Sequence, residues 1–151
     1  MRIEEAIKQR EFSNPHHKAH VNILYTAAGL NQHTSAKLKP FGISVQQFNI
    51  LRILRGRKNE ASTVKLLTER MIDKMSNASR LVDKLVNKGL VERRTCSEDR
   101  RRVDVFITKK GMDVLHAASE AVELGIGDQL GQKISESEAI ELNRILDKIH
   151  S

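Results

Sequence analysis

The order of elements in the middle of the chain limits the possible folds more than any other feature of the sequence. "STVKLLTERM", residues 62–71, is predicted to be a short helix, and "DKMSNASRLVDKLVNKG", residues 73–89, is predicted to form a second helix directly after it. Two strands follow, at 90–95 and 102–108, joined by the turn "CSEDR". Two short helices and then a two-stranded hairpin are typical of a winged helix-turn-helix, in which the hairpin is the wing.

Helical periodicity also dominates on both sides of this region. Further helices are predicted at 14–38, at 44–56, from Thr108 onward, and from 135 to 149. Capping residues mark where they begin. Ser44 pairs with Gln47 and Ser135 with Glu138 in capping boxes, and Thr108 is a predicted N-cap. The sequence therefore predicts a single domain over 1–151 that is all-α with a small β-hairpin wing.

Caps and breaks in the remaining segments are predicted from single residues. Ser62 is expected to cap the helix at 62–71, and Asp73 is expected to cap the next helix, which ends at Gly89. The helix after Thr108 is expected to close at a glycine cluster, which consists of Gly125, Gly127 and Gly131. That cluster lacks the preceding strand and the following Lys-Ser/Thr of a phosphate-binding loop, so we read it as a helix break.

Length and composition narrow the class of protein. The chain has 151 residues, 39% of them apolar, which is enough for one core. No apolar run approaches the roughly 20 residues that a membrane span needs. The first residues, "MRIEEAIKQREF", lack the apolar core of a secretory signal, and the single Cys96 cannot form an internal disulfide. We therefore expect a cytoplasmic protein, associated with the nucleoid when bound to DNA, with no membrane contact and no cofactor.

The net charge of +7 is concentrated in the middle of the chain. Residues 51–110 hold 17 lysines and arginines against 8 aspartates and glutamates, whereas the remaining residues hold 9 against 11. A segregated positive excess is expected of a protein that binds a polyanion, although it is also compatible with a merely basic surface.

The predicted helix from Asp73 to Lys88 has two chemically different faces. At about 100° per residue, its apolar residues Met75, Ala78, Leu81, Val82 and Leu85 gather on one side. Short polar groups and cations lie nearly opposite, at Asp73, Ser76, Asn77, Arg80, Lys84 and Asn87. Asn can form paired hydrogen bonds with adenine, and Arg with guanine, so this face suits base recognition in a major groove. An ordinary amphipathic helix remains the alternative for this pattern taken alone.

The turn between the strands carries three consecutive arginines, Arg100, Arg101 and Arg102, which repel one another. An arginine at the tip of a wing can enter a narrow minor groove, where the potential is most negative. Asp99 is the odd residue in a surface for DNA, and we expect it to anchor one arginine by a charge-assisted hydrogen bond.

Two motifs in this region resemble the MarR family of bacterial transcriptional regulators. "SRLVDKLVNKGLVERR" and "SEDRRRVDVFITKKG" are similar to that family's recognition helix and wing, with Ile107 where the family's Leu-Thr-x-x-Gly has leucine. The resemblance is specific between about Ser44 and Leu115; outside that span only helix order and length agree.

The resemblance implies a homodimer in which each winged helix reads half of a near-palindromic operator, with Arg101 in the minor groove. It implies that residues 1–40 and 111–151 form dimerisation helices around a DNA-binding lobe at 41–110. The resemblance also implies regulation by a small ligand bound between the lobe and the dimerisation helices, or by thiol oxidation. Most members repress transcription, and some activate it.

These considerations give a set of predicted site residues. The DNA-binding set is Ser62, Thr63, Lys65, Lys74, Ser76, Asn77, Ser79, Arg80, Lys84, Arg94, Arg100, Arg101 and Arg102. Asp99 is predicted to anchor the wing. The apolar stripe of the last helix has little of its own chain to pack on, so we predict that it forms the dimer interface; it consists of Leu142, Ile145, Leu146 and Ile149.

Other functions are less well supported by the residues. A winged-helix adaptor that binds an acidic protein partner remains an alternative. A redox or metal-responsive regulator is a minor one, because Cys96 lies near arginines, and because His16 and His20 have a spacing that can hold a metal. We expect no metal site and no enzyme activity, since the sequence holds no paired nucleophile and base and no carboxylate pair at a useful spacing.

Overall fold

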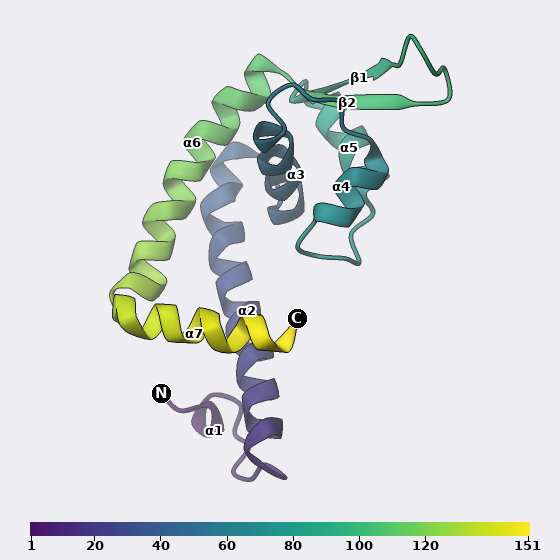
Figure 1. Ribbon diagram of the computed structural model, residues 1–151. Helices are drawn as coiled ribbons and strands as arrows, with labels where there is room; N and C mark the ends of the chain where they lie inside the picture. Colours follow the sequence, from purple (N-terminus) through teal and green to yellow (C-terminus); the bar gives the residue numbers. More distant parts are fainter.

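The computed structural model describes residues 1–151, and no residue is left out. The chain is mostly helical and carries one two-stranded antiparallel sheet (Figure 1). The elements, in chain order, are α1 Ile3–Ala6, α2 Pro15–Leu38, η1 Lys39–Phe41, α3 Val45–Gly56, α4 Val64–Arg70, α5 Ala78–Asn87, β1 Val91–Thr95, β2 Val103–Ile107, α6 Lys109–Ile126, η2 Gly127–Gly131 and α7 Glu136–Ile149.

Local capping determines where most helices begin. Ser44 and Gln47 form the predicted capping box of α3, and Ser135 and Glu138 form that of α7. The side chain of Thr108 accepts a hydrogen bond from the Gly111 N–H at the start of α6, as predicted. These helix starts could be predicted because both partners lie within one turn of sequence.

The two predicted strands form the wing. Val91 pairs with Ile107 and Thr95 with Val103 in an antiparallel register. The far edge of β2 is fastened at one point, where the Val105 N–H donates to the Ser62 carbonyl at 2.7 Å. Val105 is fully buried, whereas Val103 is 41% exposed because the ladder extends beyond the helices that cover its root.

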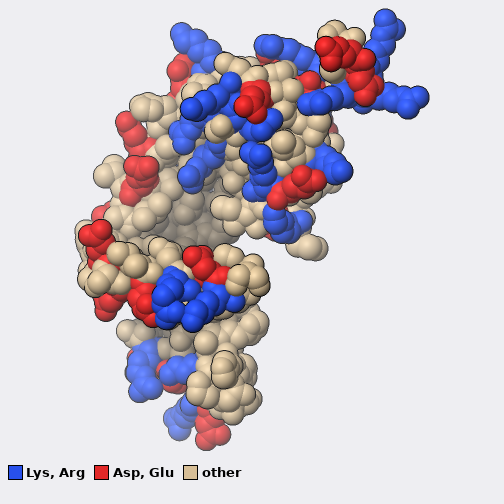
Figure 2. Space-filling model, viewed as in Figure 1, with Lys and Arg blue, Asp and Glu red and all other residues tan.

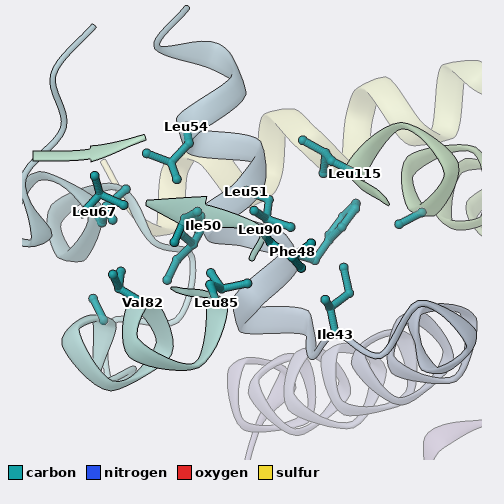
Figure 3. Close-up of a cluster of buried hydrophobic side chains, with 14 of the residues drawn as sticks. Ile43, Phe48, Ile50, Leu51, Leu54, Leu67, Val82, Leu85, Leu90 and Leu115 are labelled. Atoms are coloured by element: carbon teal, nitrogen blue, oxygen red, sulfur yellow. The ribbon is translucent and has the colours of Figure 1, made fainter. Parts of the chain in front are cut away.

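One apolar core joins the wing to the helices around it. Figure 3 shows Ile50, Leu51 and Leu54 of α3 pointing toward side chains of α4, α5 and the wing. The core stripe of α5 consists of Ala78, Val82 and Leu85, as predicted, but not of Met75, which is 93% exposed. Leu115, Ala118 and Val122 extend the core along α6. The contacts fix the hairpin and α5 relative to each other through α3.

The two long helices α2 and α6 pack against each other beside this core (Figure 1). Gly125 lies against His33 of α2, and a Cβ atom at Gly125 would come within 3.0 Å of His33 Nε2. The helix does not break there: α6 continues to Ile126 and then widens into the π-turn of η2. Helix α6 therefore ends within the predicted glycine cluster, although Gly125 itself serves a close contact with α2.

Short α1 was not predicted from the sequence. Helix α1 is a single turn. The Lys18 ammonium of α2 donates a hydrogen bond to the Glu4 carboxylate of α1 at 2.5 Å. That contact spans 14 residues, so no local pattern reveals it. No helix of the chain combines the length and the apolar character needed to cross a membrane.

Candidate nucleic-acid interface

Helix α5 begins later than the sequence predicted. Asn77 is its N-cap, and Asn77 Oδ1 accepts a hydrogen bond from the Arg80 N–H at 3.1 Å. Asp73 does not cap the helix; its carboxylate accepts from the Met75 N–H at 2.9 Å and closes a turn. Both Asp73 and Asn77 could cap a helix start in this segment. Asn77, which lies nearer the buried stripe of α5, is the one that does so.

The cap changes what Asn77 can offer a ligand. Recognition of adenine by two hydrogen bonds needs both the oxygen and the NH₂ of an amide, and the oxygen of Asn77 already accepts one hydrogen bond from its own helix, which holds the side chain against the backbone. Ser79, Arg80 and Lys84 project from the exposed face of α5. Ser76 is half-buried in the turn before the helix. The cations of α5 are therefore its most available groups for contact with DNA.

Helix α4 contributes less than the sequence predicted. Ser62 is fully buried and its carbonyl is bonded to β2, so its predicted DNA contact is wrong. Its predicted cap is also wrong, because Thr63 caps α4 by accepting from the Leu66 N–H. The next cations are exposed: Lys65 lies on α4, and Lys74 reaches the Glu69 carbonyl at the end of α4.

The wing turn is held by backbone hydrogen bonds. The Arg102 N–H donates to the Asp99 carbonyl at 3.0 Å, and the Cys96 N–H donates to the Arg102 carbonyl at 2.9 Å. The Asp99 carboxylate accepts from the Arg101 N–H at 3.0 Å, so Asp99 anchors the turn through its backbone. Asp99 therefore holds one arginine by a charge-assisted hydrogen bond, as predicted, and it does so through the backbone N–H of that arginine. Arg100 and Arg101 are exposed and form no ion pair.

The carboxylate that holds an arginine side chain belongs to Asp104. Arg102 Nε donates to Asp104 Oδ1 at 2.8 Å, and this hydrogen bond raises the pKa of the Arg102 guanidinium above its usual value. Asp104 is only 7% exposed, so it fixes Arg102 against the wing rather than leaving it free for DNA. The sequence carried a signal for this pair, because residues two apart on a strand lie on the same face.

Two further ion pairs orient the wing. Arg93 of β1 pairs with Asp83 of α5, which links the wing to the helix. Arg94 pairs with Glu92, and its guanidinium lies 4.6 Å from the centre of the Phe106 ring. Arg94, which was predicted to contact DNA, therefore already has intramolecular partners.

Many of the cations gather on one part of the molecule. Figure 2 shows Lys and Arg side chains gathered over the wing and the helices beneath it, with acidic side chains along the edge formed by α6. We call the exposed and unpaired predicted residues of α5 and the wing turn the recognition surface; it consists of Ser79, Arg80, Lys84, Arg100 and Arg101. Such a surface can meet phosphates through its cations and base edges through the α5 side chains.

The histidines and Cys96, which could have served a metal- or redox-responsive regulator, do not come together in one site. No three His, Cys, Asp or Glu side chains lie close enough together to hold a metal ion. Cys96 is half-buried at the base of the wing turn.

A helix-turn-helix whose second helix lies beside a cationic hairpin defines the class of winged-helix DNA-binding proteins. Residues 41–102 match the sequence profile of the MarR family. This match confirms the resemblance to the MarR family of transcriptional regulators that the two motifs predicted.

Several known proteins are similar to this chain. The transcriptional repressor MprA of Escherichia coli is 27% identical over 128 residues, which cover 85% of this chain and 72% of MprA. The regulator RdhR, solved with 2,4-dichlorophenol, has a TM-score of 0.81 at 22% identity over 93% of this chain and 85% of its own. MepR of S. aureus, solved with DNA, has a TM-score of 0.76 at 20% identity over 92% and 97% of the two chains. The two structural likenesses establish the predicted fold.

Proposed function

We propose that the chain is a homodimeric repressor that binds a near-palindromic operator through two copies of the recognition surface and is released by a small-molecule effector. The observation that carries the proposal is the exposed cationic face of α5 beside the free arginines of the wing. Helix α5 is amphipathic enough to present one face to DNA while the other packs in the core. In this proposal, Arg101 enters the minor groove and Arg80 meets base edges in the major groove.

The experiment that tests this proposal starts from an operator selected from random DNA. Arg101→Ala should weaken binding to all sequences and lower the slope of log affinity against log salt by about 1. Arg80→Ala should relax the base preference at one position of each half-site, by about 1–3 kcal/mol. Lys133→Ala, an exposed cation between η2 and α7, is the matched control and should change neither property. Unchanged binding in both arginine variants would refute the proposed surface.

Exposed apolar side chains support the proposed dimer. Leu142, Ile145 and Ile149 of α7 are 44%, 45% and 64% exposed, and Leu24 and Tyr25 of α2 are 58% and 47% exposed. Surfaces of this kind on two terminal segments are typical of oligomer interfaces. The proposal assigns dimerisation to residues 1–40 and 111–151 and DNA binding to residues 41–110. Two-fold symmetry would then place two α5 helices about 34 Å apart, which is one turn of DNA.

Release by an effector is supported by an open depression where α2 meets the start of α3. It has a volume of about 650 Å³ and is lined by residues that include Ala28, Ser35, Lys39 and Ile43. The related MprA is a repressor, and RdhR was solved with a small aromatic molecule. A ligand in this depression can change the conformational equilibrium of the dimer only if it binds more tightly to the conformation with one spacing of the two α5 helices than to the conformation with another. Screening small molecules for release of labelled operator tests this part directly.

A further inference from the structure

The turn between α4 and α5 exposes two large apolar side chains. Ile72 is 85% exposed and Met75 is 93% exposed. The backbone around them is held in place: the Ile72 N–H donates to Asn49 Oδ1 at 2.9 Å, and the Met75 N–H donates to Asp73 Oδ1 at 2.9 Å. Folding gains nothing by holding apolar groups in water, so these positions favour a partner that the isolated chain lacks.

The position of the turn indicates what that partner is. The turn leads directly into Asn77, the N-cap of α5, and it lies with α4 and α5 on the side of α3 away from α2 and α6 (Figure 1). It is therefore separate from the exposed apolar faces of α2 and α7. Two exposed cations lie near the apolar pair: Lys74 stands between Ile72 and Met75, and Arg80 is in the first turn of α5.

The chemistry of the turn fits DNA better than a protein. Lys74 and Arg80, which lie near the apolar pair, complement a polyanion. Two isolated side chains are also far smaller than the roughly 800 Å² per partner of a stable protein interface. Within a DNA major groove, the one apolar group on the base edges is the 5-methyl of thymine.

We propose that Met75 and Ile72 contact thymine 5-methyl groups in the major groove and so contribute to sequence preference. This inference rests on the proposed function, because it requires α5 to enter that groove. It adds a hydrophobic component to recognition that the cationic recognition surface does not supply. The segment lies at the N-terminal end of α5, which is the end nearest the bases in helix-turn-helix complexes.

The test uses the full-length protein and the operator selected from random DNA, with thymines replaced one at a time by deoxyuridine, which lacks only the methyl group. Loss of one buried methyl predicts about a three- to fivefold weaker binding of the wild-type protein at the contacted positions. At the thymine that Met75 contacts, Met75→Ala should bind the thymine and deoxyuridine duplexes equally. Ile72→Ala should do the same at the thymine that Ile72 contacts. Met75→Leu should keep the discrimination. Lys84→Ala is the matched control, because it should weaken both duplexes by the same factor.

The outcomes separate this inference from the proposed function. Discrimination between thymine and deoxyuridine that is lost in Met75→Ala or Ile72→Ala and retained in Lys84→Ala supports the inference. An operator that is bound but shows no methyl dependence, or the same dependence in both alanine variants as in the wild-type protein, overturns it and leaves the proposed function standing. If the wild-type protein selects no duplex at all, the proposed function fails and the inference fails with it.

Discussion

Gly111 shows how one residue without a side chain lets the wing join α6. A Cβ atom there would lie 2.1 Å from the Leu90 carbonyl oxygen and 2.8 Å from Ile107 Cγ1. The same Leu90 carbonyl accepts a hydrogen bond from the Thr108 N–H at 3.1 Å, so it cannot easily move away. The glycine of the Thr-x-x-Gly motif is therefore required by contact with a backbone oxygen.

Gly111→Ala should lower the free energy of unfolding by about 3 kcal/mol, at the upper end of the cost of overpacking, because the clash is with backbone. Urea denaturation followed by circular dichroism measures this effect. Gly56→Ala is the matched control: no atom lies within 4 Å of the added Cβ, so the change should be neutral or stabilise by up to about 1 kcal/mol. Equal stability of the two variants would contradict the steric explanation.

At the scale of elements, the start of α5 depends on one side chain. Asn77→Ala removes the acceptor for the Arg80 N–H and should cost about 1 kcal/mol in unfolding free energy. Asn77→Asp keeps the acceptor and places a negative charge at a helix N-terminus, so stability should be retained. The same aspartate should weaken DNA binding, because it adds an anion beside the recognition surface. A loss of stability in both variants would show that Asn77 stabilises the protein by other means.

Helix α1 should respond to acid. The hydrogen bond from Lys18 lowers the pKa of the Glu4 carboxyl below its usual value. The resulting stabilisation is fully present above the unfolded pKa of about 4.3 and is lost as the pH falls through the lower folded value. The protection of the α1 amides from hydrogen exchange, relative to the intrinsic rate at each pH, should therefore fall as the Glu4 carboxyl is protonated. In Lys18→Met this protection should be low at every pH; high protection in that variant would contradict the assignment.

The elements that sequence analysis predicted well are those whose partners lie close together in the chain. The capping boxes at Ser44 and Ser135 and the cap at Thr108 each involve a residue three positions away. The wrong predictions concern residues whose environment is determined by distant parts of the chain. Ser62 is buried by β2, which lies more than 40 residues later.

Competition between neighbours explains the remaining errors at the candidate site. Asp73 and Asn77 can both cap a helix, and only the position of the buried stripe selects Asn77. Asp99 and Asp104 each hold an arginine, and the turn conformation places the Asp99 carboxylate on the Arg101 backbone N–H, whereas Asp104 accepts from the Arg102 side chain.

At the scale of the whole molecule, the proposed dimer depends on the apolar face of α7. Ile145→Lys should place a charge in that interface and shift the protein from dimer to monomer, which sedimentation velocity measures. Operator affinity should fall with it, because one recognition surface alone loses the second half-site. Asp147→Lys, on the opposite face of α7 by helical spacing, is the matched control and should remain dimeric. A dimeric Ile145→Lys protein would contradict the assigned interface.

The hairpin leaves most of its outer backbone uncovered, since β1 has a partner on one side only and β2 is fastened on its other side at Val105 alone. Open strand edges recruit strands from other molecules and so promote aggregation. Here the edges carry Arg93, Arg94 and the arginines of the turn, and two such ribbons would repel each other on approach. The charges that suit the wing to a nucleic acid therefore also act as gatekeepers against self-association, and neutralising them should make the purified protein less soluble.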